Sequence, residues 1–299
     1  MKYGYIGLGN LGGRLAASLV QAGFDLTVYD KNAALAERHL ALGAKWADSP
    51  TQLAQQVDAV LTCLPSPVVS ANVLQELIAA KKRDLHWLEM STLGRDDIQV
   101  LAQQAQAAGM QVLESPVTGG VHLAAQGKIT VIVGGEQSLF EQHRPAFEAM
   151  GSKIFYMGAL GSAAIIKVIT NMLAFIHLVA DGEALMLAKR GGLDLAQAWA
   201  VIQASSGNSF VHETEGQLIL NGSYDIAFTM DLALKDLGFA LNFGREFGVP
   251  LDLAGLTQQT FVKGKAAYGG QAQSTQIVKL LEDVLQTNLR AEGFPSRLE

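Results

Sequence analysis

The sequence predicts an α/β fold: an N-terminal doubly wound, Rossmann-type sheet followed by an all-α second domain. Short apolar runs alternate with helical patterns up to about residue 157, and only helical patterns follow. The first apolar run leads directly into a glycine-rich turn of the Gly-x-Gly-x-x-Gly type. Strands that alternate with helices form parallel sheets, so we expect a dinucleotide-binding domain over 1–160. Residues 161–299 should form an all-helical domain for substrate binding and oligomerisation.

The first thirty residues carry the most specific local signal. A strand at 2–7 meets the turn, a helix at 13–22 ends at Gly23, and a second strand covers 25–30. In this context the glycines allow a tight turn and close approach of a pyrophosphate, which sits at the helix N-terminus. An ordinary turn is the alternative for an isolated glycine triplet, but the surrounding strands and helix favour dinucleotide binding. The cofactor-binding residues predicted here are Gly7, Leu8, Gly9, Asn10, Leu11 and Gly12.

Asp30 closes the second strand, where a carboxylate can accept hydrogen bonds from the adenosine ribose. The same charge repels a 2′-phosphate, so we expect NAD, with NADP possible because Lys31 offsets part of the repulsion.

The remaining strands of the first half are expected at 57–64, 85–90, 110–114, 129–134 and 153–157, with helices between them. Ligands of such sheets bind outside the carboxyl ends of the strands. The segments that follow the strands are therefore further site candidates: Leu64-Pro65, Ser91-Thr92 and Thr118-Gly119-Gly120.

The chain from 158 to 189 predicts one long apolar helix that contains no proline. Its polar residues Lys167, Thr170, Asn171, His177 and Asp181 fall within an arc of roughly 120° at about 100° per residue, with Glu183 opposite. A membrane span is the first alternative, but the ionisable side chains in this segment argue against it. A buried helix with one polar stripe fits better, and Glu183 should be a buried or interface carboxylate.

Lys167 and Asn171 share a helix face at spacing i, i+4. An apolar environment lowers a lysine pKa from about 10.4 and suits it to exchange a proton with a substrate hydroxyl. A lysine that extends from a core helix to solvent is an equally open interpretation of the spacing.

The other candidates each have a structural alternative. Thr118–Gly120 could offer backbone N–H groups to an anion or form a plain turn. His122 could add a proton-dependent positive charge or lie on the surface. Ser91 and Thr92 could bind a ribose or a carboxylate, or start a helix. Lys235 and Asp236 could form a solvated pair. No residues have metal-site spacing, so we expect no metal.

Composition excludes several classes. The net charge is −6 and no basic cluster is present, so we expect no nucleic-acid partner. The single cysteine, Cys63, lies in an apolar run and indicates a reducing compartment. The first strand begins at once, which predicts no leader and, for a bacterial source, a soluble cytoplasmic protein. The apolar second domain predicts a homodimer or homotetramer.

These segments together resemble the 3-hydroxyisobutyrate dehydrogenase group of the β-hydroxyacid dehydrogenases, within the 6-phosphogluconate dehydrogenase superfamily. The resemblance covers nearly the whole chain and includes Leu64-Pro65-Ser66, Met90-Ser91-Thr92, Pro116–Gly120, Gly161 through Asn171, and Phe228 through Asp236. It implies NAD(P)-dependent oxidation of a small anionic 3-hydroxy acid or reduction of the matching semialdehyde. It also implies that Lys167 is the general acid/base, that Asn171 and Thr118–Gly120 bind substrate, and that Lys235 closes over substrate and nicotinamide.

Three positions depart from the family pattern: Thr118 stands for Ser, Thr170 for Asn and Ala163 for Gly. With His122 they bear on the substrate more than on the reaction. The related imine reductases generally lack the lysine, so its presence favours alcohol–carbonyl chemistry. The alternatives are an NADPH-dependent reductase of glyoxylate or succinic semialdehyde, and a dinucleotide-binding sensor without catalysis.

Overall fold

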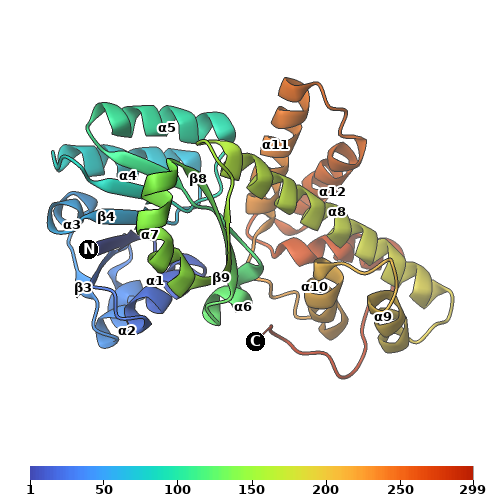
Figure 1. Ribbon diagram of the computed structural model, residues 1–299. Helices are drawn as coiled ribbons and strands as arrows, with labels where there is room; N and C mark the ends of the chain where they lie inside the picture. Colours follow the sequence, from blue (N-terminus) through green and yellow to red (C-terminus); the bar gives the residue numbers. More distant parts are fainter. Residues whose placement is uncertain (299) are drawn as a thin grey trace. The chain divides into compact units, whose positions relative to one another are not determined.

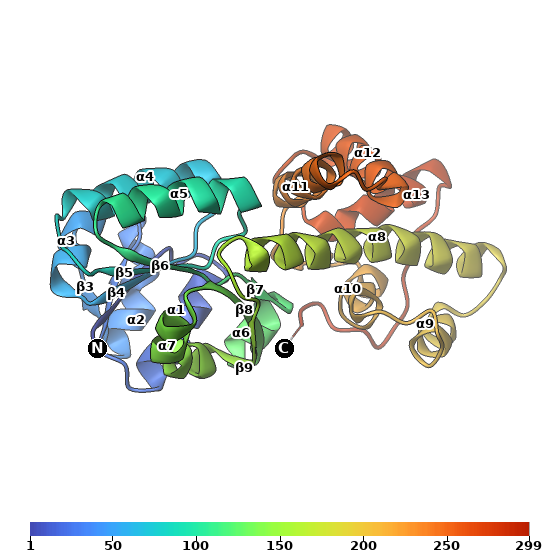
Figure 2. The same cartoon turned by 45° about the horizontal axis from the view of Figure 1, so that its top comes forward.

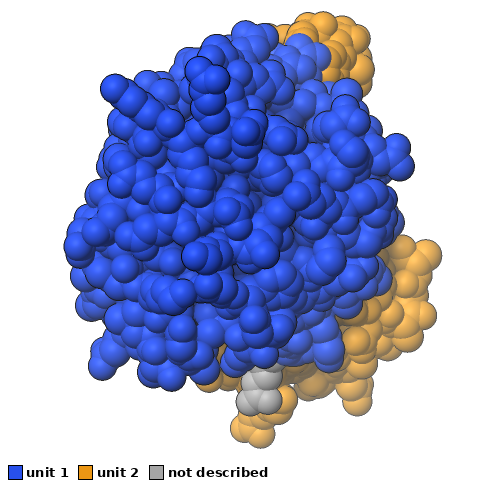
Figure 3. All heavy atoms as spheres, turned by 60° about the vertical axis from the view of Figure 1, so that its left-hand side comes forward, with its two compact units in different colours: residues 1–167 blue, residues 168–299 orange. Residues whose placement is uncertain are grey.

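The computed structural model describes residues 1–298. The chain forms two compact units, residues 1–167 and 168–299, coloured separately in Figure 3. The division falls inside a long helix, α8 (Ser162–Arg190), rather than in a linker. Lys167 is thus the last residue of unit 1.

Unit 1 alternates strands and helices, as predicted. Its strands are β1 (Tyr3–Ile6), β2 (Leu26–Tyr29), β3 (Lys45–Trp46), β4 (Ala59–Thr62), β5 (His86–Glu89), β6 (Gln111–Glu114), β7 (Val117–Thr118), β8 (Ile129–Gly135) and β9 (Gly151–Tyr156). Its helices are α1 (Gly12–Gln21), η1 (Ala33–Ala36), α2 (Glu37–Ala41), α3 (Pro50–Gln56), α4 (Pro67–Ala79), α5 (Arg95–Ala107), α6 (Gly120–Ala125) and α7 (Gln137–Met150). The sequence patterns missed β3, β7 and α6 because these elements are too short to show periodicity.

The strand order is β3-β2-β1-β4-β5-β6-β8-β7, and β9 pairs with β8. Strands β1 to β6 are parallel, and the order reverses between β1 and β4, where ligands bind in doubly wound sheets. The predicted fold class is confirmed in this part. β8 differs, because it runs antiparallel to β6. The segment that joins them contains only the two-residue β7 and the six-residue α6, too little helix for a normal parallel crossover.

Helices cover both faces of the sheet (Figures 1 and 2). Helices α1 and α7 pack on one face through Leu15, Leu19 and Phe147, and α3, α4 and α5 pack on the other through Leu53, Leu74 and Ile98. The central strands β1, β4 and β5 are buried on both faces of the sheet, which explains their continuous apolar runs in the sequence.

Hydrogen bonds between three buried aromatic side chains join α7 to the sheet. The Tyr3 hydroxyl lies 3.0 Å from His143 Nδ1, and His143 Nε2 lies 2.8 Å from His86 Nδ1. Burial, followed by the nearby His86, lowers the pKa of His143 to about 3. His143 is therefore neutral at physiological pH, and its two hydrogen bonds link α7 to strands β1 and β5.

Unit 2 is all-helical, as predicted. After α8 come α9 (Leu195–Gln203), α10 (Phe210–Asn221), α11 (Met230–Phe247), α12 (Asp252–Tyr268), η2 (Ser274–Val278) and α13 (Lys279–Val284). Figure 2 shows α8 as a central rod with α9 and α10 on one side and α11, α12 and α13 on the other. Phe175, Leu178 and Leu185 of α8 enter the core of this unit.

The surface of α8 corrects one prediction. The helix was expected to be buried around a polar stripe, yet Ile169, Leu173 and Leu187 are 37%, 43% and 75% exposed. Glu183, expected to be a buried or interface carboxylate, is exposed in the single chain. By length and composition α8 alone among the described helices could cross a membrane, but the same test is passed by core helices. Its buried Lys167 and Asp181 favour a helix of a folded protein.

Candidate dinucleotide and substrate site

The glycine loop between β1 and α1, residues 7–12, has the form of a phosphate-binding loop and is here called the glycine cradle. Gly7 has φ 99°, and a Cβ there would lie 2.3 Å from the Cys63 carbonyl oxygen. A Cβ on Gly12 would lie 2.1 Å from the Gly7 carbonyl oxygen, so both positions require glycine. A Cβ on Gly9 would instead meet nothing within 4 Å, which leaves open space over the loop. Within residues 1–298 no side chain caps α1, so its N-terminal dipole faces that space. These residues fit a dinucleotide pyrophosphate.

Asp30 lies at the end of β2 and is tied to this loop. Its Oδ2 accepts a 2.7 Å hydrogen bond from the Leu8 backbone N–H, and its Oδ1 accepts one of 2.8 Å from Asn32. Each oxygen retains a second acceptor position. The carboxylate thus fixes the loop and keeps a negative charge beside it.

The loops after β4 and β5 are joined to each other. The Leu64 backbone N–H donates to Ser91 Oγ at 2.8 Å, and the Ser91 N–H donates to Glu89 Oε1 at 2.8 Å. Glu89 is 1% exposed, and its burial raises its pKa. Pro65 is exposed and Thr92 is half-buried at the same edge of the sheet. The structure therefore brings these predicted residues together with the glycine loop at the carboxyl ends of parallel strands.

The turn Thr118-Gly119-Gly120 opens into α6. Gly119 and Gly120 have φ 122° and 86°, values that an L-residue with a side chain rarely adopts. The His122 ring lies over this turn, with Nδ1 3.1 Å from the position of a Cβ on Gly120. Burial lowers the pKa of His122. The predicted positive charge at this place is therefore weak at neutral pH, and the ring presents a hydrogen-bonding group instead.

Lys167 lies on the second turn of α8 and is only 7% exposed. The first turn is held by Glu114 at the end of β6, whose carboxylate accepts from the backbone N–H groups of Gly161, Ala163 and Ala164. A lysine with so little exposed surface does not extend into bulk solvent, so the solvated alternative is disfavoured.

Unit 2 contains a second polar group around Asp236 of α11. Asp236 is 1% exposed; its Oδ2 accepts a 2.6 Å hydrogen bond from Asn171 Nδ2, and its Oδ1 lies 3.2 Å from Lys235 Nζ. Lys235 also lies over the Phe239 ring, 5.5 Å from its centroid. Asp236 thus orients two predicted site residues. From the sequence, Asp236 was interpreted as one member of a solvated pair with Lys235. Only its position next to Lys235 in a family motif indicated a role in the site.

Two members of the polar stripe, His177 and Asp181, are not among the predicted site residues. His177 is exposed. Asp181 is buried and accepts a 2.5 Å hydrogen bond from His212 Nδ1, while His212 Nε2 lies 2.9 Å from the Trp199 carbonyl oxygen. Burial lowers the pKa of His212. The hydrogen bonds to Asp181 and to the Trp199 carbonyl raise it by more, so the pKa of His212 is raised overall. This pair fastens α8, α9 and α10 together.

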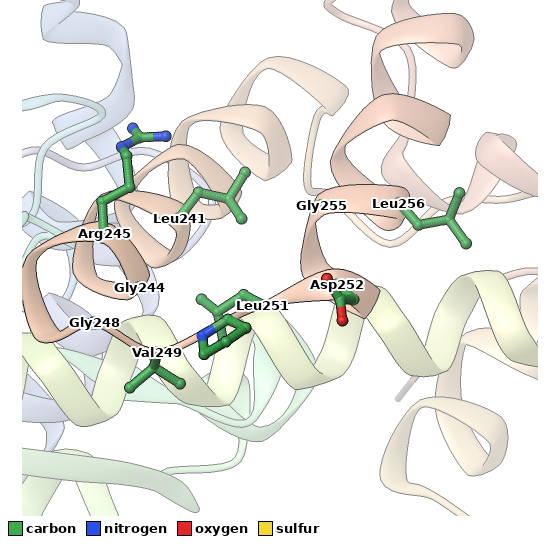
Figure 4. A pocket seen from close by; sticks show the side chains of 10 residues that line it. Leu241, Gly244, Arg245, Gly248, Val249, Leu251, Asp252, Gly255 and Leu256 are labelled. Carbon is green, nitrogen blue, oxygen red and sulfur yellow. The ribbon is translucent and has the colours of Figure 1, made fainter.

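A surface groove lies where α11 turns into α12 (Figure 4). Its only charged lining residues are Arg245 and Asp252; most of the others are glycines and aliphatic side chains. It has no predicted site residue. Over residues 1–298 there is also no group of His, Cys, Asp or Glu side chains that could hold a metal ion.

A doubly wound sheet with an open glycine cradle, followed by a helical unit, defines a dinucleotide-binding protein of the Rossmann class. Residues 2–158 match the model of the NAD binding domain of 6-phosphogluconate dehydrogenase. Residues 161–281 match the NAD-binding region of NADP-dependent 3-hydroxyisobutyrate dehydrogenase. The chain belongs to the 3-hydroxyisobutyrate dehydrogenase-like β-hydroxyacid dehydrogenases, an NAD(P)-dependent family, and the predicted resemblance is confirmed.

Relatives align along most of the chain. The sequence is 29% identical to 2-(hydroxymethyl)glutarate dehydrogenase of Eubacterium barkeri, over 95% of this chain and 96% of that one. It is 30% identical to the mitochondrial 3-hydroxyisobutyrate dehydrogenase of Mus musculus, over 86% and 80%. The structure matches Mycobacterium tuberculosis 3-hydroxyisobutyrate dehydrogenase with L-serine at TM-score 0.84 and 28% identity, over 94% and 98%.

The buried Asp236 gives a first prediction. Asp236→Ala removes the acceptor that orients Asn171 and Lys235, and hydrogen bonds to a charged group contribute about 1.5–3 kcal/mol. We expect kcat/KM for the hydroxy acid to fall roughly 10- to 100-fold, while the Kd for the cofactor changes little. Steady-state kinetics and calorimetric titration measure the two quantities. Asp231→Asn, on the same helix but paired with Lys265 at the surface, is the matched control. Equal losses in both variants would contradict the role of Asp236.

Proposed function

We propose that this protein transfers a hydride between NAD and a small 3-hydroxy acid, or the corresponding semialdehyde, with Lys167 as general acid/base. The observation that carries the proposal is the 7% exposure of Lys167, one helical turn from Asn171, in a chain of this family. Burial of an amine favours its neutral form, which can accept the hydroxyl proton.

The bound nicotinamide supplies the hydride acceptor in oxidation. The protein's residues bind and orient the substrate and move the proton. The N–H groups of Thr118–Gly120 receive the substrate carboxylate, and Asn171, held by Asp236, donates to the reacting oxygen. Lys167 takes the hydroxyl proton as the carbonyl forms and returns it in the reverse direction. Lys235 adds a positive charge near the anionic substrate.

The substrate class is supported by the chemistry of the relatives' ligands. 2-(Hydroxymethyl)glutarate, 3-hydroxyisobutyrate and L-serine each carry a primary alcohol on the carbon next to the α-carbon of a carboxylate. A common core of carboxylate and β-hydroxyl leaves the 2-substituent to be read by Thr118 and by the neutral ring of His122.

NAD is preferred over NADP in this proposal because Asp30 keeps its charge beside the glycine loop. The alternative, an NADPH-dependent reductase of glyoxylate or succinic semialdehyde, requires a 2′-phosphate near that carboxylate. A sensor that binds the dinucleotide without catalysis does not account for a buried lysine and an oriented asparagine on one helix face.

We also propose that the protein is cytoplasmic and assembles as a homodimer or homotetramer. The support for the assembly is a stripe of exposed apolar residues along α8 at helical spacing: Ile169, Leu173, Ala180, Ala184 and Leu187. Contiguous apolar surface of this kind marks protein–protein contacts.

Lys167→Ala tests the mechanism. Loss of a general acid/base lowers kcat by roughly 10²–10⁴-fold, so we expect such a loss on the best substrate of a panel of 3-hydroxy acids, including amino-substituted and sulfonated ones. Reduced-nicotinamide absorbance follows turnover in both directions. The exposed Lys153→Ala is the control. A kcat near that of the wild type in Lys167→Ala contradicts the mechanism, and no turnover of any panel member by the wild type supports the sensor.

The cofactor choice is tested with Asp30→Asn, which removes the charge and keeps an acceptor oxygen. The ratio of kcat/KM for NAD to that for NADP should exceed one in the wild type. It should fall at least about tenfold in the variant, because repulsion of the 2′-phosphate is lost. Asp30→Ala also loosens the Leu8 contact, an effect on both cofactors that cancels in the ratio. An NADP preference in the wild type would overturn the assignment.

The oligomer is tested by placing charges on the α8 stripe. Leu173→Lys combined with Leu187→Lys should lower the molar mass measured by light scattering, because charged side chains oppose burial of the stripe. Val68→Lys, at an exposed apolar position of unit 1, should leave the mass unchanged. A monomeric wild type would refute the proposal.

A further inference from the structure

We propose that Glu114 is a positioning residue for Lys167: its buried carboxylate, at the end of β6, caps α8 and fixes the helical turn from which the lysine projects. This inference rests on the proposed role of Lys167. It assigns to Glu114 a function that the dinucleotide and substrate contacts do not include.

The hydrogen bonds at the start of α8 account for every backbone donor of its first turn. Glu114 Oε1 accepts from Gly161 at 2.5 Å and from Ala163 at 2.9 Å, and Oε2 accepts from Ala164 at 3.0 Å. The Ser162 N–H donates to the Ala159 carbonyl, and the Ile165 N–H to that of Gly161. A helix start normally relies on a Ser, Thr, Asp or Asn next to it in sequence. Here a residue from a distant strand fills that place.

The surrounding backbone leaves room for this carboxylate. Gly134 of β8 is the register partner of Glu114, and a Cβ on it would lie 2.4 Å from Glu114 Oε1. Gly161 adopts φ 101°, which turns the chain into the helix and aims its N–H at the carboxylate. Both glycines therefore serve one contact.

The negative charge of the Glu114 carboxylate suits its position at the N-terminus of α8. A carboxylate at a helix N-terminus interacts favourably with the helix dipole. Burial raises the pKa of Glu114 to about 7, against the lowering effect of the three N–H bonds. Ionisable groups on the neighbouring elements include Glu89, its register partner on β5, Arg95 of α5, which lies over Gly161, and Lys167 itself. Protonation of Glu114 near neutrality removes the charge and weakens the cap.

The link to Lys167 is short and rigid. Ala163 and Ala164, which donate to Glu114, are four and three residues before Lys167 and therefore lie directly beneath it on the helix. Displacements of about 1 Å in a catalytic group can cost 10²-fold in rate. A cap that shifts or frays the first turn therefore changes where the amine sits and how strongly it is desolvated.

A purely stabilising cap makes a different prediction from a positioning one. Loss of a stabilising cap lowers the melting temperature and leaves the titration of Lys167 unchanged. Loss of a positioning cap changes the reactivity and pKa of that single lysine in a protein that is still folded.

The test is trace labelling of all lysines with acetic anhydride, read by mass spectrometry from pH 5.5 to 10. In the wild type, the Lys167 labelling curve should show a second inflection near the Glu114 titration. Glu114→Gln, which keeps the shape but can no longer accept three N–H bonds, should remove that inflection and change Lys167 reactivity at least about threefold. Gly134→Ala should do the same by displacing the unaltered carboxylate. Glu141→Gln, an exposed carboxylate on α7 paired with Arg144, is the matched control.

Kinetics give the second arm. Glu114→Gln should lower kcat about tenfold or more, move the acid limb of the kcat–pH profile, and leave the KM for NAD within about twofold. In a Lys167→Ala background the same change should have little further effect on kcat.

The outcomes are separable. A wild-type kcat in Lys167→Ala refutes the proposed mechanism, whereas the labelling arm does not depend on turnover and judges Glu114 alone. A Lys167 labelling curve with a single inflection in the wild type, or one that is unchanged in folded Glu114→Gln or Gly134→Ala, overturns the positioning role. Because the wild-type curve needs no variant, a failure of the variants to fold leaves the inference open to refutation.

Discussion

The cost of taking charged groups out of water explains which buried polar contacts hold α8. A buried carboxylate or amine is tolerated only where hydrogen bonds or an opposite charge compensate it. Glu114 meets three backbone N–H groups, Asp236 meets Asn171 and Lys235, and Asp181 meets His212. Glu114 and Asp236 bind α8 or a residue on it, and Asp181 lies on α8 and binds His212 of α10. The helix is therefore held by polar contacts at its start, in its middle and farther along, while apolar packing fills the spaces between them.

Much of the fold could be predicted because its signals are local. The glycine cradle, the apolar parallel strands and the change to helices near residue 160 are all encoded within short windows. The antiparallel β8 was missed because strand direction depends on how a connection returns, which a window of apolar residues does not record. The exposure of Leu173 and Leu187 was missed for a related reason: apolar composition does not record which side of a helix the rest of the chain covers.

Candidate site residues could be predicted where one residue type has one task. Gly7, Gly12 and Asp30 were predicted because turn geometry and ribose chemistry restrict the choice. Asp236 and Glu114 could not be found in this way, since their partners are far away in sequence and a lone carboxylate near Lys or Pro is usually solvated. The polar stripe shows the limit from the other side. Helical spacing places Lys167 and Asp181 on one face, but only the packing of α10 assigns Asp181 to His212 rather than to substrate.

The proposed site separates backbone features from the side chains that lie beside them. In the proposed mechanism, hydride transfer requires a bound dinucleotide, the Lys167 amine and a receptor for the substrate carboxylate, and these depend on backbone features such as the glycine cradle and the start of α8. Substrate choice is proposed to depend on the side chains beside that receptor. Thr118 adds a methyl group to the hydroxyl expected there, and His122 contributes an uncharged ring above Gly120. Changes at these two positions alter the side chains beside the turn and leave its backbone N–H groups in place. On the proposed mechanism, the same scaffold can therefore accept different 2-substituents while Lys167 is unchanged.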